Sequence, residues 1–562
     1  MTQTAAPPTS SSPGGLTHRQ ILVVLSGLLL GMFLAALDQT IVATAMKTIA
    51  DKLDGQTAQA WVTTAYLITS TVTTPLYGKL SDIYGRRGLY LFAITIFVVG
   101  SVLCGMANDI YQLAAYRAVQ GLGAGGLMSL AFTIVGDMVP PRDRGKYQAY
   151  FMSVFAVSSV LGPVLGGLLA GHDSILGFDG WRWIFYINVP IGLVALAVVY
   201  RVLKLPHTRS DHRIDFVGAA LLTLGVVPLL IVAEKGNAWG WTSGISLLSL
   251  VGGVVALVLF VLWEVRMGEE AILPMRFFRN SVFSITNVMS FIVGMGMFGG
   301  IAALPLYLQI VKGESPTRSG LLLLPLMVGI MSASAVSGAV MSKTGRYKVL
   351  PTAGTALMVV ALLLFSTLVV DTSLWTASAF MVLMGWGLGL CMQTLVVSIQ
   401  NAMPAKDMGV ATSSATFFRS MGGTFGTAVF LSILFNSVGD NIKSRFTELQ
   451  NGDPAGFAEA ARQLTPAQAE KLQAGGAGST DALNNTDFIH DLPRLLERVF
   501  LNGFADSMHW VFLIAALLVI PAFALSFFVK EIPLRATAGM AARAEDEAEA
   551  DAARAKAETA VL

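Results

Sequence analysis

A short loop pattern that occurs twice places the strongest constraint on how this chain can fold. The first copy, residues 78–87, reads GKLSDIYGRR, and the second, residues 338–348, reads GAVMSKTGRYK. The glycines and the arginine that follows them keep the same spacing, and each copy lies between long apolar segments. Internal duplication in a membrane chain is typical of transporters built from two related halves. The repeat therefore predicts two helical halves and a mechanism of alternating access.

The composition places the chain in the membrane-protein class. Of its 562 residues, 54% are hydrophobic and only 13% are charged, which is too apolar for a soluble protein of this size. Fourteen apolar segments are long enough to cross a bilayer as helices. We therefore expect an all-α membrane protein with fourteen transmembrane helices. Every second loop is rich in Lys and Arg, which predicts that both termini are cytoplasmic.

The repeat also predicts how the spans are grouped. The first copy follows span 2 and the second follows span 10, so the offset is eight spans rather than six. Two six-helix halves must then be separated by two extra central helices. The expected segments are a disordered N-terminus (1–17), an N-terminal half (18–205), two linker helices (206–280), a C-terminal half (281–533) and a disordered tail (534–562).

One connection is unusually long and polar. Residues 437–506 are expected to join spans 13 and 14 as an outer loop, in which residues 457–463 are candidates for a short helix. The loop has either a functional role or none, as a tolerated surface insertion.

Few charged residues lie inside the predicted spans, where an ionisable group costs about 2.5 kcal/mol or more at the helix centre. Asp38 in span 1 and Arg117 in span 4 lie at compatible depths in the outer half, and Arg419 lies in the inner half of span 13. One interpretation is that Asp38 binds and releases a proton, and the alternative is a static ion pair with Arg117. Arg419 either contacts the substrate or only satisfies backbone carbonyls.

The sequence lacks the motifs of the common catalytic and nucleotide-binding sites. It contains no Gly-x-Ser-x-Gly, His-Glu-x-x-His or Gly-x-x-x-x-Gly-Lys-[Ser/Thr], and its six histidines lie outside or at the edges of the spans. Cys104 and Cys391 lie in apolar runs and predict neither a disulfide nor a metal site. We therefore expect no enzyme activity, no ATP hydrolysis, no cofactor and no metal. The net charge of +2 does not suggest a nucleic acid partner.

Five motifs occur in order along the predicted spans. They are Leu37-Asp38-x-Thr40-Ile41-Val42, Gly78-x-Leu80-x-Asp82-x-x-Gly85-Arg86-Arg87, Arg117-x-x-Gln120-Gly121-x-Gly123, Gly162-Pro163-x-x-Gly166-Gly167 and Trp181-Arg182-Trp183-Ile184-Phe185-x-Ile187-Asn188-x-Pro190. Together they resemble motifs of the major facilitator superfamily, and more closely those of its fourteen-span drug:proton antiporters of the EmrB/QacA type. The resemblance covers roughly residues 20–530.

The resemblance implies a role for each motif. Asp38 and Arg117 would couple transport to protons. The residues implied in conformational gating are Gly78, Asp82, Gly85, Arg86, Arg87, Asp137, Gly162, Pro163, Gly166 and Gly167. Among them, Asp82, Arg86 and Asp137 would form a charge cluster that holds the halves together on the cytoplasmic side, whereas a plain basic loop would not explain the acid. Pro163 would kink span 5, either to seal a leak path or only for packing.

Departures from the family pattern bear on the substrate. The second loop copy has Ser342 in place of the acid, and the acids that exporters of divalent cations carry in spans 10 and 13 are missing. We therefore expect lipophilic substrates that are monovalent cations, neutral or zwitterionic. The side chains expected to contact them are Tyr66, Gln120, Phe298, Trp386, Gln393, Phe417 and Arg419. Any single one of these could instead face lipid or pack between helices.

These inferences predict a proton-coupled antiporter that exports lipophilic small molecules by alternating access, and the resemblance favours multidrug efflux. We expect a monomer in a bacterial plasma membrane, with protons and the lipid bilayer as its other partners. The alternative is an exporter of the same fold that is dedicated to an endogenous metabolite or a cell-envelope lipid.

Overall fold

The computed structural model describes residues 17–53, 58–203, 214–465 and 492–534, together with Gln468 and Ile489. Within these ranges the chain is almost entirely helical, and its only strands are β1 (Ser174–Ile175) and β2 (Phe178–Asp179), which form a short antiparallel hairpin. The expected disordered ends, 1–17 and 534–562, lie outside the described residues except for Thr17 and Leu534.

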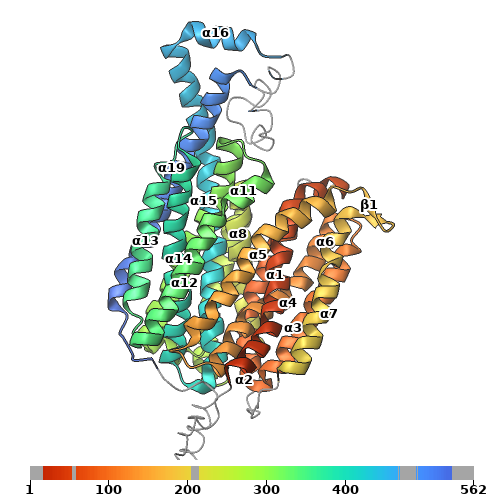
Figure 1. Cartoon of the computed structure of the whole chain (residues 1–562), viewed down its shortest axis with the longest axis vertical. Helices are drawn as coiled ribbons and strands as arrows, with labels where there is room; N and C mark the ends of the chain where they lie inside the picture. Colours follow the sequence, from red (N-terminus) through yellow and green to blue (C-terminus); the bar gives the residue numbers. More distant parts are fainter. Residues whose placement is uncertain are drawn as a thin grey trace, which may run out of the picture.

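The first part of the chain forms one helical bundle, drawn in red to yellow in Figure 1. Its helices are α1 (His18–Lys52), α2 (Gln59–Tyr84), α3 (Arg86–Gly105), α4 (Ile110–Met138), α5 (Arg144–Ala170), the short turns η2 (Gly180–Arg182) and α6 (Trp183–Tyr186), and α7 (Asn188–Val202). One hydrophobic core, with residues from Ile21 to Leu203, lies inside this bundle.

The last part of the chain forms a second bundle beside the first (Figure 1). It comprises α10 (Ser281–Leu306), the π-helical turn η4 (Tyr307–Val311), α11 (Pro316–Leu322), α12 (Leu324–Thr344), α13 (Val349–Phe365), α14 (Leu374–Ala402), η5 (Ala405–Asp407), α15 (Met408–Gly452), α16 (Pro454–Arg462) and α19 (Arg494–Phe528). A second core runs from Val282 to Leu534, and Met152 of α5 joins it from the first bundle.

Two helices, α8 (Phe216–Trp239) and α9 (Gly244–Met267), and the turn η3 (Met275–Arg279) connect the bundles. A third core joins buried residues of α2, α8, η3, α10, α14 and α15. The linker helices therefore lie against the seam where α2 of one bundle meets α15 of the other. The other seam between the bundles is made by α5 with α11 and α12.

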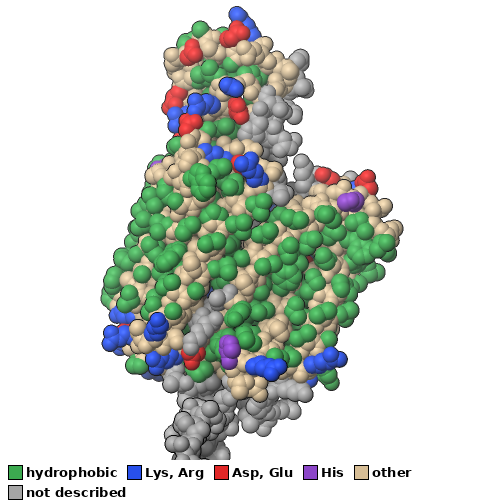
Figure 2. Space-filling view, viewed as in Figure 1, with side chains coloured by type: hydrophobic (Ala, Val, Ile, Leu, Met, Phe, Trp, Pro, Cys, Tyr) green, Lys and Arg blue, Asp and Glu red, His purple; other side chains and the backbone are tan. Residues whose placement is uncertain are grey.

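The predicted fold class is confirmed. Twelve helices of the described residues are long and apolar enough to cross a membrane. α13 is a shorter apolar helix of 17 residues, and α2 has 26 residues but carries several Ser and Thr. With these two, the helices are consistent with the fourteen expected spans. Figure 2 shows apolar side chains across the middle of the molecule, mainly basic side chains at its lower end, which we call the basic end, and both basic and acidic side chains at its upper end.

At the opposite end the structure differs from the expected outer loop 437–506. α15 continues without a break to Gly452 and α19 begins at Arg494, so both ends of that segment are helical. The candidate helix 457–463 corresponds to α16 (Pro454–Arg462). The extended helices hold each other through polar contacts: Arg445 makes two bonds to Asp506, at 2.7 and 3.0 Å, and Asn441 donates to Ser507 at 2.8 Å. The expected loop is therefore in part a helical stalk, made of residues 437–462 and 494–506 (Figure 1).

Candidate functional site

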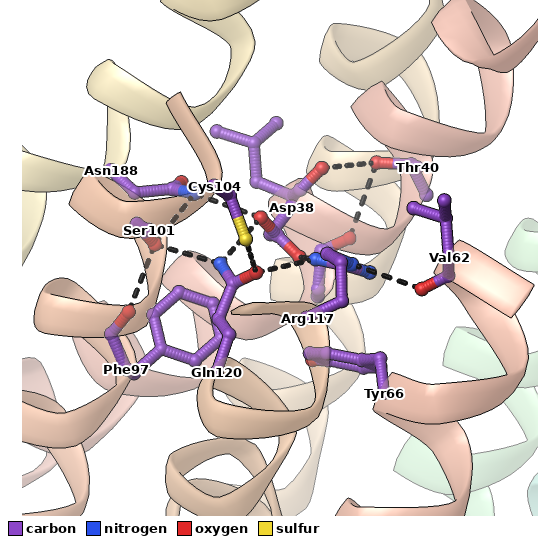
Figure 3. Close-up of polar contacts among 12 residues, drawn as sticks. Asp38, Thr40, Val62, Tyr66, Phe97, Ser101, Cys104, Arg117, Gln120 and Asn188 are labelled. Carbon is purple, nitrogen blue, oxygen red and sulfur yellow. Dashed lines mark hydrogen bonds and ion pairs between the residues drawn. The ribbon is translucent and has the colours of Figure 1, made fainter. Parts of the chain in front are cut away.

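Asp38 is the centre of a buried polar network in the first bundle (Figure 3). Its side chain is fully buried in α1. One carboxylate oxygen accepts a bond from Nη1 of Arg117 at 2.5 Å, and the other accepts from the amides of Gln120 and Asn188, each at 2.8 Å. The predicted partners Asp38 and Arg117 are thus brought together, with α4 and α7 supplying the donors.

Arg117 is held by contacts from two other helices, α1 and α2, as well as from its own. Its Nη1 also donates to the side-chain oxygen of Gln120 at 2.6 Å, and its Nε donates to the carbonyl of Val62 at 3.4 Å. The guanidinium lies 4.1 Å from the ring centroid of Tyr66 in α2. Tyr66 and Gln120, both expected to contact substrate, therefore contact the ion pair directly. A cation over an aromatic face gains further electrostatic stabilisation away from water.

Asn188 and Ser101 complete the network and were given no role by the sequence. The hydroxyl of Ser101 in α3 accepts from Gln120 at 2.7 Å and from Asn188 at 3.3 Å, and donates to the carbonyl of Phe97 at 2.9 Å. These bonds orient both amide groups towards Asp38. The available signal was a polar Asn at the start of an apolar run, in a motif already quoted for its resemblance.

The network around Asp38 joins five helices, namely α1, α2, α3, α4 and α7. Breaking a buried ion pair leaves an uncompensated charge, which typically costs 3–5 kcal/mol. Any loss of the negative charge of Asp38 would release Arg117 and two amide donors at once. The carboxylate therefore helps to hold the helices of the first bundle in their positions.

A second cluster closes the seam between α2 and α15 at the basic end. The carboxylate of Asp82 in α2 accepts bonds from the backbone N–H groups of Gly409 and Val410, at 3.1 and 3.0 Å, at the start of α15. An anion at a helix N-terminus is stabilised by the exposed N–H groups and the helix dipole. Burial, and secondarily the charge of Asp82, raises the pKa of the neighbouring Asp407.

Arg86 connects Asp82 to Asp137. Its guanidinium contacts Asp82 and donates to Asp137 of α4 at 2.8 Å. Gly85, with φ of 91°, makes the turn between α2 and α3 that places Arg86 there. Gly78 allows the close approach of α15, because a Cβ at this position would lie 2.8 Å from the carbonyl oxygen of Gly409. The predicted charge cluster exists, and it also reaches across to the second bundle.

The seam between α5 and α12 is closed by a positive charge. Nε of Arg142, before α5, donates to the carbonyl of Ser342 at 2.6 Å, and an Nη donates to that of Lys343 at 3.2 Å, at the end of α12. Cations are favourable at helix C-termini. Arg144 adds a contact with Gln400 of α14. In the sequence these arginines are recognisable only as part of a basic loop.

The remaining gating candidates lie apart from the cluster. Arg87 ties α3 to α7, where it donates to the carbonyl of Tyr200 at 2.7 Å. Gly162 and Gly166 let α5 approach α1 closely, since a Cβ on Gly162 would lie 2.2 Å from Oγ1 of Thr40. Pro163 of the same helix faces Gly320 of α11 across the seam, whereas a Cβ on Gly167 would meet nothing within 4 Å.

The substrate candidates of the second bundle do not form one cluster. Phe298 of α10 is 42% exposed, Trp386 packs half-buried in the second core, and Phe417 is buried in the core under the linker helices. The side-chain oxygen of Gln393 accepts a 3.4 Å bond from Ser337, while its Nε2 is buried without a partner.

Arg419 of α15 points from the second bundle towards the first. Its guanidinium lies 6.0 Å from the ring centroid of Phe132 in α4. Among the described residues it has no acid within ion-pair distance and makes no side-chain hydrogen bond. Arg419 is therefore an uncompensated positive charge between the bundles.

Comparison with known proteins shows clear similarity. The model of the family described as Major Facilitator Superfamily matches residues 28–427. The multidrug transporter protein MdtP of Bacillus subtilis is 33% identical over 535 residues, covering 93% of this chain and 95% of MdtP. Multidrug resistance protein 3 of the same species is 33% identical over 525 residues, covering 93% and 97%. An uncharacterized MFS-type transporter of Mycobacterium tuberculosis is 36% identical over 532 residues, covering 94% and 72%.

Solved structures share the fold. The proton:xylose symporter XylE, bound to 6-bromo-6-deoxy-D-glucose, superposes with a TM-score of 0.58 at 15% identity, covering 92% of this chain and 97% of XylE. The human organic anion transporter MFSD10 superposes with a TM-score of 0.55 at 14% identity, covering 89% and 99%.

The Asp82 cap generates a testable prediction. Asp82→Asn removes the charge that binds the start of α15, so the basic end should open more often. We expect a cysteine placed at Ser413, which lies against Gly78 in the seam, to react severalfold faster with a hydrophilic maleimide. The measurement is the alkylation rate in a background with Cys104 and Cys391 replaced by Ser. The matched control is Asp173→Asn, at an exposed ion pair with Lys52. Equal alkylation rates in the parent protein, in Asp82→Asn and in Asp173→Asn would contradict the prediction.

Proposed function

Because the chain belongs to the major facilitator superfamily, we propose that it is a proton-coupled antiporter that exports lipophilic small molecules by alternating access. The observation that carries the proposal is the buried carboxylate of Asp38, bonded to Arg117, Gln120 and Asn188. An ionisable group at this depth is expensive and marks a functional path in membrane proteins. The transport of small molecules follows from the family; the proton and the direction are our inference.

The proposed cycle uses the two sites in turn. Substrate enters from the cytoplasm or inner leaflet while Asp38 is ionised. The bundles then rock, the Asp82 and Arg142 contacts close the basic end, and substrate leaves outward. Asp38 takes a proton from outside, its bonds to Arg117 loosen, and the protonated carrier returns. The closed contacts at the basic end support a cytoplasm-closed state, if the basic end faces the cytoplasm as the positive-inside rule predicts.

We propose monovalent cationic or neutral lipophilic compounds as the substrates, and multidrug efflux as the role. MdtP and multidrug resistance protein 3 are named for multidrug transport or resistance. The aromatic side chains Tyr66, Phe298, Trp386 and Phe417 can adapt to different apolar ligands. The carrier would act as a monomer in a bacterial plasma membrane, with both termini cytoplasmic.

The stalk favours a second candidate, an exporter dedicated to an endogenous metabolite or cell-envelope lipid. A cavity of about 260 Å³ lies where the stalk meets the bundle. It is lined by Asn441, Ser444, Arg445, Glu448, Asp506, His509 and Trp510. A helical extension with a polar cavity at its base is a place where a released lipid head group could bind.

The proton role of Asp38 can be tested in liposomes that hold an internal pH dye. We expect ethidium to drive proton movement through the native protein. Asp38→Asn should abolish that flux, because an amide cannot bind and release a proton. Asp173→Asn should behave as the native protein. An Asp38→Asn variant that still accumulates ethidium against a gradient would disprove the coupling role.

A double variant separates proton coupling from a static ion pair. Asp38→Asn with Arg117→Gln removes both buried charges, so the cost of leaving either one unpaired disappears. If the pair only locks the bundle, substrate-dependent proton flux should return. We expect instead that the double variant stays folded, by its melting temperature, and carries no proton flux.

Arg419 yields a prediction about substrate charge. A guanidinium without a counter-ion should repel a cationic substrate. Arg419, unlike the residues of the Asp38 network, can be replaced without leaving a described partner unpaired. We expect Arg419→Gln to lower the apparent KM for ethidium about tenfold, equivalent to about 1.4 kcal/mol, and to leave that for a neutral drug nearly unchanged. Arg419→Lys keeps the charge and should resemble the native protein. Equal effects of both variants on both drugs would place Arg419 away from the substrate.

A further inference from the structure

A pair of buried carboxyl groups lies in the linker helices, away from the network of Asp38. Asp215 immediately precedes α8, and Glu264 lies near the end of α9. Asp215 is 4% exposed and Glu264 is fully buried. Neither residue belongs to the motifs that resemble the family's.

In each carboxyl group, one of the two oxygens accepts hydrogen bonds from nearby donors. Oδ1 of Asp215 accepts from the backbone N–H of Gly218 at 2.7 Å and from the indole N–H of Trp263 at 2.9 Å. One oxygen of Glu264 accepts from the backbone N–H of Leu273 at 2.9 Å. These donors fix the orientation of both groups.

The other two oxygens lie near the same point of the structure. Oδ2 of Asp215 and Oε1 of Glu264 are buried and accept no bond from any donor among the described residues. Both point to the space beside Gly218, because a Cβ there would lie 2.4 Å from the first and 2.6 Å from the second. The two carboxyl groups therefore lie close together, and they interact electrostatically. Two ionised oxygens cannot bond to each other, since both are acceptors, whereas a proton on one of them would supply the donor.

The surrounding charges do not neutralise the pair. Lys79 of α2 is the basic group that interacts with Glu264 electrostatically, but its ammonium is bonded to the backbone carbonyl of Glu269 at 2.7 Å. Arg276 of η3 pairs instead with Glu269 and Asp407. Among the described residues, no basic side chain forms an ion pair with Asp215 or Glu264. Two negative charges in contact at a buried site would repel, and sharing one proton removes the repulsion.

We propose that Asp215 and Glu264 form a second proton-binding site, in which one proton is shared between the facing oxygens and joins α8 to α9. The site is independent of proton coupling at Asp38. Glu264 also bonds to Leu273, which leads into η3 and α10, and the linker helices cover the α2–α15 seam. Loss of the proton would therefore loosen the linker where it meets the gating cluster.

Infrared spectroscopy of the purified full chain tests the proposal directly. At neutral pH the native protein should show the C=O stretch of a protonated carboxylic acid. Glu264→Gln and Asp215→Asn should each remove that band, because a single remaining carboxyl group bonded to an amide is ionised. Glu269→Gln, a matched change at an exposed ion pair nearby, should leave it unchanged. If the difference spectra of the native protein minus each pair variant show no loss of such a band, the proposal is wrong.

Thermal unfolding supplies a second readout. The folded protein would hold one proton that the unfolded chain releases at neutral pH, so stability should fall as pH rises. We expect the melting temperature of the native protein to decrease from about pH 5, just above the ordinary pKa of a carboxyl group, up to alkaline pH. In Glu264→Gln the side-chain amide supplies a hydrogen-bond donor at every pH, so the melting temperature of this variant should decrease less. The melting temperature of Glu269→Gln should follow that of the native protein. If Na⁺ or K⁺ raises the native melting temperature at alkaline pH but not that of Glu264→Gln, the site binds a metal cation instead and the proton proposal is wrong.

Discussion

The high cost of an unpaired charge in a low-dielectric interior governs the polar architecture of this protein. At Asp38 the carboxylate is matched by a guanidinium and two amides. At Asp82 it is matched by the N-terminus of a helix from the other bundle and by Arg86. Arg419 lacks such a match among the described residues, which is why we propose that it senses the charge of a substrate.

Each of the two seams between the bundles is closed by a charged side chain at a helix terminus, and the two charges are opposite. On one, an anion in α2 binds the positive end of α15; on the other, Arg142 binds carbonyls at the negative end of α12. The repeated loop explains the difference, because its first copy carries Asp82 and its second carries Ser342. The missing acid does not leave the second seam open, since a cation from the facing bundle uses the helix terminus directly. Both contacts are strong only while the helix ends meet their partners, so they can release together when the bundles rock.

Much of the fold could be predicted from the sequence because hydrophobic length and loop charge are local properties. The span pattern followed from them, and the contact of Asp38 with Arg117 followed from the compatible depths of two rare charges inside the spans. The helical stalk did not, since residues after 437 are polar and their helix is stabilised by a partner helix, through Arg445 and Asp506. The role of Asn188 was missed for a similar reason: a lone amide in an apolar run gives no sign of which distant carboxylate it will face.

The linker helices show how a segment outside the repeat can still bear on gating. Two helices inserted between related halves need no role in alternating access, and their outward surfaces are largely apolar. Yet their inner face lies on the α2–α15 seam, and a buried carboxyl pair joins them beside the segment that leads into α10. An apolar contact in place of the pair would hold two helices equally well, because buried polar groups seldom add net stability. What the pair offers instead is sensitivity to the pH at that end of the molecule, at the place where the two bundles meet.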